Sequence, residues 1–323
     1  MEVREVVIVG YPRAELLEIA GISSSLDAAN RLGVAPPYRV RLATPGGRDI
    51  TCHSGMTLRG EVALERLTGP LDTVIVAGGF GSADAAGDAR LVGHLRRLAG
   101  ESRRVASVCT GAEVLAATGL LDGRRATTHW IYANEIAARY PRVTVDPEPI
   151  YIREGKLATA AGVTSALDLT LAFIEEDHGP EPARMVARAL VTYLQRPGNQ
   201  AQMSIFVAAP PGGQEPVRRA VAFVGSHLDG DLSATTLAAE IGVSVRHLTR
   251  LFRIELGHTP GNYVRKARTE AAAQLLLTTR LPVAAIATRC GFGSAETLRQ
   301  AFLTRYGITP ARFRTAVGGQ NGA

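Results

Sequence analysis

Cysteine is scarce in this chain, with Cys52, Cys109 and Cys290 spread over 323 residues. Their wide spacing matches neither a disulfide framework nor a metal-binding motif. The sequence therefore predicts a protein of a reducing compartment that holds no metal or other cofactor. Cys52 is interpreted as incidental, and Cys290 as a small core residue.

Long apolar runs are also missing. No stretch approaches the roughly 20 apolar residues of a membrane-spanning helix, and the start, MEVREVVIVG, is charged where a signal peptide would be apolar. We expect a cytoplasmic protein of bacterial type, associated with the nucleoid and without a membrane partner. A chain of 323 residues that is 46% hydrophobic is long enough for about two domains.

Acidic residues are few in the C-terminal part. From residue 216 onward 14 Lys and Arg face 6 Asp and Glu, whereas the first 215 residues hold 22 against 24. A basic small domain beside a near-neutral larger one is typical of nucleic-acid binding, although a solvated basic face is the alternative. Most of these cations are arginines, which grip phosphate or guanine with two donors.

A segment rich in Pro, Gly and Gln separates the two parts. It contains the breakers PPGG and lacks helical periodicity. We expect a first domain at residues 1–195, a linker at 196–215, a second domain at 216–317 and a disordered tail at 318–323.

The second domain repeats itself after about 50 residues. Residues 232–264 match 281–314, each copy having a short helix, a glycine turn and a second helix that opens at a serine, Ser244 or Ser294. The equivalent pairs include Gly242 with Gly291, Phe252 with Phe302, Gly257 with Gly307, Pro260 with Pro310 and Tyr263 with Phe313. Each copy is predicted to be a helix-turn-helix.

Two such units joined by a long helix resemble the DNA-binding domain of the AraC/XylS family. The resemblance rests above all on CGFGSAETLRQAFLTRYGITPARFR. It implies double-stranded promoter DNA as a partner, two recognition helices in successive major-groove segments, and a homodimer that contacts RNA polymerase. The residues expected to face bases are Arg246, Thr249 and Arg250 in one groove and Ala295, Glu296, Arg299 and Gln300 in the next, while His247 and Arg253 contact phosphate or solvent.

The first domain alternates strand and helix patterns. Residues 5–10, 38–45, 73–81 and 104–109 are β-branched runs, and helical spacing marks 14–33, 89–100 and 110–119. This alternation predicts a flavodoxin-like α/β fold, a doubly wound parallel sheet whose ligands bind at the carboxyl ends of the strands. The second domain is expected to be all-α.

Candidate site residues fall at those strand ends. Gly78 and Gly79 follow one strand, and their backbone N–H groups are expected to be free to face an anion. Cys109 follows another strand at a strand-to-helix turn, where Thr110 and a helix N-terminus would favour thiolate. Glu18 follows the first strand, and His129 follows a further short strand. An inert core cysteine and a structural histidine are the alternatives.

These residues resemble the ThiJ/PfpI superfamily, which includes class I glutamine amidotransferase-like domains. The resemblance rests on VIVAGGFG, VCTGAEVLAATGLLDGRRATTHW and LATAAGVTSALDLTLAFIEE, and the domain order is that of GlxA-like transcriptional regulators. By position Cys109 matches the elbow cysteine, Glu18 its neighbouring acid and His129 the downstream histidine. Thr110 stands where proteolytic members have histidine, so their catalytic dyad is missing.

Three functional hypotheses follow. The favoured one is a non-enzymatic, DNA-binding regulator, expected to be an activator, whose first domain dimerises and senses a small polar metabolite near Cys109. The second is a cysteine-dependent hydratase, amidase or glyoxalase with an appended DNA-binding domain. The third treats the first domain as an oligomerisation scaffold.

Overall fold

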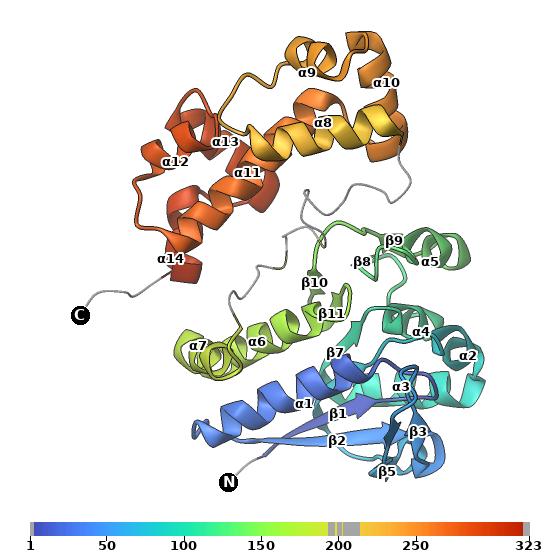
Figure 1. Cartoon of the computed structure of the whole chain (residues 1–323). Helices are drawn as coiled ribbons and strands as arrows, with labels where there is room; N and C mark the ends of the chain where they lie inside the picture. The colour runs from blue at the N-terminus through green and yellow to red at the C-terminus, as the bar shows by residue number, and fades with distance from the viewer. Residues whose placement is uncertain (1–2, 193–197, 199–201, 203–213, 319–323) are drawn as a thin grey trace. The chain divides into compact units, whose positions relative to one another are not determined.

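The computed structural model describes residues 3–192, 198, 202 and 214–318. The chain separates into two compact units, Met1–Gln202 and Met203–Ala323 (Figure 1). Most of the predicted linker and of the predicted tail lies outside the described residues. Gly198 and Gln202, which the structure does describe, make hydrogen bonds with the first unit.

The first unit is built on a seven-stranded sheet with the order β10-β11-β7-β6-β1-β2-β5. Its inner strands are buried on both faces, as the continuous β-branched runs require. All neighbouring strands run parallel except the pair β10 and β11. The bounds are β1 Arg4–Val9, β2 Tyr38–Thr44, β5 Val62–Ala63, β6 Leu71–Val76, β7 Ser102–Val108, β10 Tyr151–Glu154 and β11 Leu157–Ala160.

Helices cover both faces of this sheet, which confirms the predicted doubly wound α/β fold (Figure 1). The helices α1 (Leu16–Arg31), α6 (Ser165–His178) and α7 (Pro180–Ala189) pack together in one layer. The other layer holds α2 (Ser82–Gly87), α3 (Ala89–Glu101) and α4 (Gly111–Ala117). Smaller elements are β3 Ile50–Thr51, β4 Thr57–Leu58, β8 Arg125–Ala126, α5 Ala133–Arg139 and β9 Thr144–Val145.

An ion-pair network closes the amino-terminal end of the central strands. Arg104 on β7 is 5% exposed and bonds Asp177 at 2.6 Å and Asp72 at 3.4 Å. Burial raises the pKa of Asp72, but hydrogen bonds from Arg103, Thr73 and Arg4 outweigh it and lower this pKa to about 2. The charged side chains at this end of the sheet are paired with one another. The candidate site residues lie at the opposite end, where the strands have their carboxyl termini.

In its described residues, 214–318, the second unit contains helices and no strands, as predicted. The helices are α8 Glu215–Ser226, α9 Ala234–Ile241, α10 Val245–Leu256, α11 Pro260–Thr278, α12 Val283–Arg289, α13 Ala295–Tyr306 and α14 Pro310–Gly318. The first half of α11 contributes Tyr263, Val264 and Ala267 to one apolar core, and its second half contributes Ala272, Ala273 and Leu276 to another. The long helix therefore joins two separately packed helix-turn-helix units.

The internal repeat is confirmed in three dimensions. Phe252 packs edge-on against Tyr263 with ring centroids 5.6 Å apart, and the equivalent pair Phe302 and Phe313 is 5.3 Å apart with nearly the same angle. Ser244 caps α10 by accepting from the His247 amide, and Ser294 caps α13 in the same way. Cys290 lies in the second core, as predicted.

Candidate functional site

Cys109 lies at the sharp turn between β7 and α4. Its backbone φ is +53°, a left-handed conformation that non-glycine residues rarely adopt, and its amide donates to the Ala160 carbonyl at 2.9 Å. The side chain is 7% exposed. Strained backbone at a strand-to-helix turn is typical of positions where a fold presents a functional side chain, and the predicted elbow is therefore present.

The glycine loop differs from the prediction that its amides are free. The Gly78 amide donates to Glu18 Oε2 at 2.6 Å, and the Gly79 amide donates to Thr110 Oγ1 at 2.8 Å. A Cβ on Gly78 would lie 2.6 Å from the Cβ of Cys109, and one on Gly79 would lie 2.4 Å from the Arg13 carbonyl oxygen. These two glycines are needed because other backbone passes so close, and their N–H groups are already bonded within the protein.

Glu18 is fully buried at the start of α1. Its Oε2 accepts from Gly78, while Oε1 has no hydrogen-bond partner among the residues that the structure describes. Burial raises the pKa of this carboxyl to about 8, against the opposing effect of the Gly78 hydrogen bond. Glu18 is therefore mostly protonated at neutral pH and presents a neutral acid beside the elbow.

The thiol of Cys109 does not have the lowered pKa that its place before a helix had suggested. Burial raises the pKa well above the usual range, and Glu18, which hydrogen-bonds the thiol and would repel a thiolate once ionised, raises it further. The Thr110 amide and hydroxyl lower this pKa but do not compensate. The expectation of a stabilised thiolate is wrong because desolvation outweighs the N-terminal dipole of the short helix α4.

His129 lies near the elbow without bonding to it. Among the described residues there is no hydrogen bond between the His129 ring and Cys109; His129 Nδ1 instead accepts from the Ile131 amide at 3.3 Å. Burial lowers the pKa of His129, so the ring is neutral. A Cβ on Gly162 would lie 3.1 Å from His129 Cδ2, which places the ring against the loop after β11.

The arrangement as a whole combines a protonated thiol, a protonated carboxyl and a neutral imidazole. A cysteine nucleophile needs an ionised base within hydrogen-bond reach or a lowered pKa. The carboxyl within reach of the Cys109 thiol is Glu18, whose pKa burial raises to about 8, and the pKa of the thiol itself is raised. Sequence reasoning missed three residues around the elbow: Tyr11, whose hydroxyl donates to the Ala77 carbonyl, Thr128, whose hydroxyl donates to the Cys109 carbonyl, and Gln202. Thr128 lies within the motif that ends in the predicted His129, whereas no local motif marks Tyr11 or Gln202.

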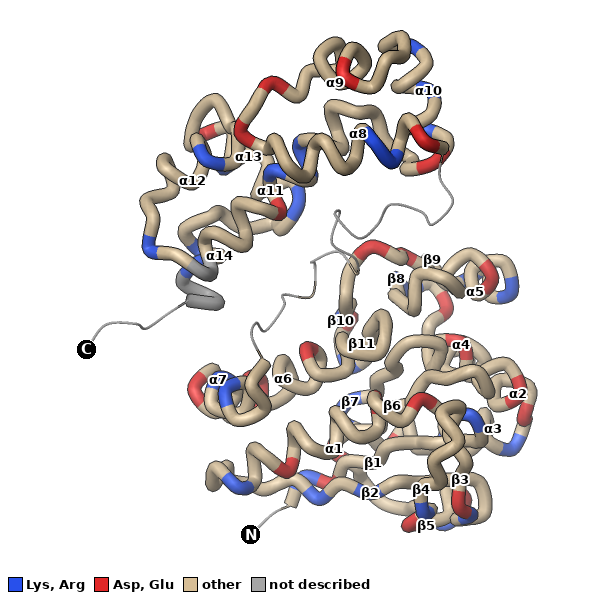
Figure 2. Tube along the Cα trace, in the orientation of Figure 1, with Lys and Arg blue, Asp and Glu red and all other residues tan. Residues whose placement is uncertain are grey.

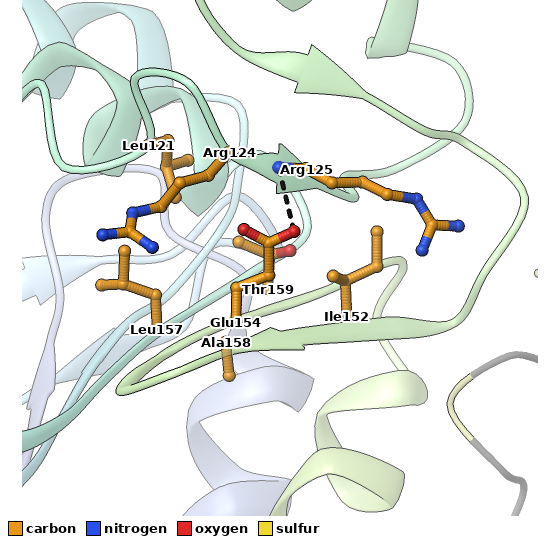
Figure 3. A pocket seen from close by; sticks show the side chains of 8 residues that line it. All are labelled: Leu121, Arg124, Arg125, Ile152, Glu154, Leu157, Ala158 and Thr159. Carbon is orange, nitrogen blue, oxygen red and sulfur yellow. Dashed lines mark hydrogen bonds between the residues drawn. The ribbon is translucent and has the colours of Figure 1, made fainter.

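A separate, shallow surface hollow lies beside β8 and β10 (Figure 3). In the figure Arg124 and Arg125 extend to opposite sides, and the Arg125 amide donates to Glu154 Oε1 at 3.3 Å. None of the predicted site residues lines this hollow. Its relevance to the elbow is indirect, because Thr159, one of its lining residues, accepts a 2.8 Å hydrogen bond from the Thr127 amide.

The helix α10 presents the features of a recognition helix. Leu248, Leu251 and Phe252 are fully buried, whereas Arg246, Arg250 and Arg253 are exposed, and Thr249 is half-buried between them. Arg246 and Arg253 have no ion pair or hydrogen bond from their side chains within the described part of the chain, and Arg250 contacts only His247. Figure 2 shows blue segments, which mark Lys or Arg, beside the label of α10. The predicted face is therefore available to a ligand.

The helix α13 is organised differently. Glu296 accepts from both nitrogens of Arg299, Nε and Nη2, at 2.7 Å and from Gln300 Nε2 at 2.9 Å. The hydrogen bonds from Arg299 and Gln300 lower the pKa of Glu296 to about 2. Three of the four residues expected to face bases thus bond to one another, and Ala295 precedes them at the helix start.

A groove of about 460 Å³ lies between the two helix-turn-helix units. It is lined from α11 by Arg265 and Arg268, and Arg268 is tied to the Leu228 and Gly230 carbonyls at 2.8 and 2.6 Å. Arg265 is exposed and its guanidinium has no partner among the described residues. The groove adds basic surface between α10 and α13.

Within the described ranges no three His, Cys, Asp or Glu side chains are placed to hold a metal ion. No described helix combines the length and apolar character needed to cross a membrane.

Comparison with known proteins identifies both parts. The DJ-1/PfpI family model matches residues 4–176, more than half of the chain. The chain belongs to the DJ-1/PfpI family. A helix-turn-helix domain model matches residues 237–316, and the chain is a helix-turn-helix transcriptional regulator that carries a DJ-1/PfpI domain.

Full-length relatives support this assignment. The chain is 34% identical over 295 residues to the HTH-type transcriptional regulator CdhR of Pseudomonas aeruginosa, covering 90% of this chain and 86% of the relative. It is 31% identical over 308 residues to the HTH-type transcriptional regulator GlxA of Rhizobium meliloti, covering 94% and 93%. An isonitrile hydratase of Pseudomonas putida matches only 54% of this chain, at 31% identity.

Solved structures support the fold of this DJ-1/PfpI regulator. A ThiJ/PfpI family protein from Pseudomonas syringae superposes with a TM-score of 0.54 at 21% identity, covering 75% of this chain and 92% of its own. Drosophila melanogaster DJ-1beta superposes with a TM-score of 0.52 at 23% identity, covering 59% and 98%.

Proposed function

We propose that this protein is a sequence-specific DNA-binding activator whose DJ-1/PfpI domain dimerises and responds to a small polar metabolite at the Cys109 elbow. The observation that carries the DNA-binding part is the pair of serine-capped helices α10 and α13, which expose Arg246, Arg250 and Arg299 from two equivalent folds. Two recognition helices on one rigid connecting helix suit two successive major-groove segments on one face of DNA.

The proposed division of roles follows from side-chain chemistry. Arg246, Thr249 and Arg250 read base edges in one groove, and Ala295, Glu296, Arg299 and Gln300 face the next. His247 and Arg253 contact phosphates, which fix the position of the protein without reading sequence. The similarity to AraC/XylS proteins supports a homodimer at a promoter and an activating contact with RNA polymerase.

The metabolite site is proposed at the elbow because its side chains are neutral and the backbone of Cys109 is strained. A buried thiol, the unpartnered Glu18 Oε1 and the half-buried His129 offer hydrogen-bond donors and acceptors to a polar, uncharged group. Binding would bias the separation of the two DNA-binding units in the dimer and so the half-site spacing it spans.

Catalysis by the elbow is the second candidate function, favoured by the partial match to an isonitrile hydratase. The raised pKa of Cys109 and the absence of a bond to His129 within the described residues weigh against it. Turnover that depends on Cys109 would distinguish this candidate from a sensor.

The test is genome-wide binding of the wild-type protein, Arg250→Ala and Cys109→Ser, with transcripts recorded from the same cells. Arg250→Ala should lose its specific sites. Cys109→Ser should keep them and lose the transcriptional response to some growth condition. If wild type occupies no specific sites, the proposed function is wrong; if Cys109→Ser behaves as wild type in every condition, the domain is a scaffold without a sensor at Cys109.

A further inference from the structure

The segment Thr127–Thr128–His129–Trp130, here called the elbow loop, connects the Cys109 site to the end of the first unit. Thr127 and Thr128 are 0% and 1% exposed, so their polar groups depend on partners within the protein. On one side Thr128 Oγ1 donates to the Cys109 carbonyl at 2.8 Å. The elbow loop therefore contacts the strained backbone of the elbow directly.

On its other side the elbow loop is held by Gln202. Gln202 Nε2 donates to the Thr128 carbonyl at 2.7 Å and to Thr127 Oγ1 at 3.1 Å, and Gln202 Oε1 accepts from the Trp130 amide at 3.1 Å. One amide side chain thus uses both its donors and its acceptor on a four-residue segment, a geometry that another residue type would not reproduce.

The backbone around Gln202 is fixed to the same unit. The Gln202 amide donates to the Glu148 carbonyl at 2.8 Å, and the Tyr151 amide donates to the Gly198 carbonyl at 3.2 Å. A Cβ on Gly198 would lie 2.4 Å from the Tyr151 ring, so the chain passes close to β10 at this point. Gln202 is also the last residue of the first unit before the chain continues toward the DNA-binding unit.

We propose that Gln202 is the positioning residue through which the Cys109 site controls the chain leading to the DNA-binding unit. A change at Cys109 shifts its carbonyl and Thr128, the elbow loop moves, and Gln202 loses its three partners. The chain is then no longer held to the first unit at Gln202. This inference rests on the proposed function, since it needs a DNA-binding unit whose reach the first unit regulates.

The only tryptophan of the chain reports on this contact, because the Trp130 amide is one of the partners of Gln202. In full-length protein Gln202→Ala should shift the Trp130 emission. It should also raise the rate at which iodoacetamide alkylates Cys109 by at least about tenfold, since one lost hydrogen bond alone corresponds to roughly that ratio and Gln202 makes three. The Cys109-containing peptide is followed by mass. Gln214→Ala is the matched control, because Gln214 is an exposed glutamine that follows residues 203–213 in the sequence. It should behave as wild type in both measurements.

Coupling between two sites must be reciprocal. Complete alkylation of Cys109 in wild type and in Gln214→Ala should therefore produce the emission shift that Gln202→Ala shows before treatment, and alkylation should add little in Gln202→Ala. An unchanged emission spectrum and alkylation rate in Gln202→Ala would overturn the proposal. So would an alkylation-induced shift of equal size in wild type and in Gln202→Ala.

Binding to the genomic sites occupied by wild type separates this inference from the proposed function. If wild type binds specific sites and Gln202→Ala shows no change in emission or alkylation, only the role of Gln202 is wrong. If wild type binds no specific DNA, the proposed function fails whatever the emission shows. Circular dichroism of Gln202→Ala should match wild type, and Gln202→Glu, which keeps the acceptor for Trp130 but loses both donors, should resemble Gln202→Ala in its alkylation rate.

Discussion

Thr110 and Gly79 exchange two hydrogen bonds: the Gly79 amide donates to Thr110 Oγ1, and Thr110 Oγ1 donates to the Gly79 carbonyl, both at 2.8 Å. Thr110 is the residue directly after Cys109, the position that holds histidine in proteolytic relatives. Its hydroxyl therefore joins the elbow to the glycine loop, and it cannot act as the base that a histidine would supply. Both residues of this contact are buried, so neither partner has water as a substitute.

Thr110→Val should destabilise the first unit, because the Gly79 amide and carbonyl both lose their partner inside the protein. The cost should be about 2–4 kcal/mol, the sum for two buried groups left without hydrogen bonds. Urea unfolding followed by Trp130 emission measures it. Thr110→Ser keeps the hydroxyl and should unfold within about 1 kcal/mol of wild type; equal stability of the valine and serine variants would show that the pair contributes little.

Glu18 should make the first unit less stable as pH rises. Its pKa is about 8 in the folded protein and near 4.5 when exposed. Between these values the native state keeps a proton that the unfolded state has lost, so the free energy of unfolding falls as pH increases. The contribution is fully present below about pH 4.5 and is lost once the pH passes about 8, at roughly 1.4 kcal/mol for each unit between the two pKa values.

Glu18→Gln isolates this contribution, because the amide cannot ionise and its oxygen still accepts from Gly78. The difference in unfolding free energy between wild type and Glu18→Gln, measured by Trp130 emission from pH 5 to 9, should move steadily against the wild type. A difference that does not change with pH would mean that Glu18 is charged in the folded protein.

The fold was largely predictable from the sequence, and the internal contacts of the site were not. Buried β-branched runs followed by helical spacing predict strands such as β1 and β7, because local periodicity reflects burial. The alternation of strands and helices also predicts that the strands run parallel. The edge strand β10 escaped prediction, since four residues pair antiparallel with β11 without a distinctive pattern. The repeat in the second unit was clear because the same glycine, serine and aromatic positions recur.

The site itself shows why residue types at strand ends are insufficient. The structure brings Cys109 and Glu18 into contact, but their protonation depends on burial, which no local pattern records. The amides of Gly78 and Gly79 looked free in the sequence and are bonded to side chains from α1 and from the turn after β7. Gln202 is remote from Thr128 in the chain and lies in a segment that composition alone marks as linker.

Arg250 and Arg253 should affect DNA binding in different ways. Arg250→Ala removes a base contact and should cost about 1–3 kcal/mol of discrimination between the specific site and single-base variants. Arg253→Ala should weaken binding to all sequences similarly and reduce the slope of log K against log salt by about one. Affinities for a matched panel of duplexes at several salt concentrations would measure both. Unchanged discrimination in Arg250→Ala would contradict the placement of the α10 reading face.

Glu296 should restrain the second recognition helix. In the structure its carboxylate holds Arg299 and Gln300, so DNA must compete with an internal acceptor for both side chains. Glu296→Ala frees them and removes a negative charge that repels phosphate; affinity for DNA of any sequence should rise and the salt slope should steepen by about one. Glu240→Ala removes an equal charge from an exposed position on α9 and is the matched control. A similar gain in affinity from both variants would mean that net charge alone is responsible. A gain confined to Glu296→Ala, together with weaker discrimination in the half-site facing α13, would identify Glu296 as the residue that limits indiscriminate binding by this helix.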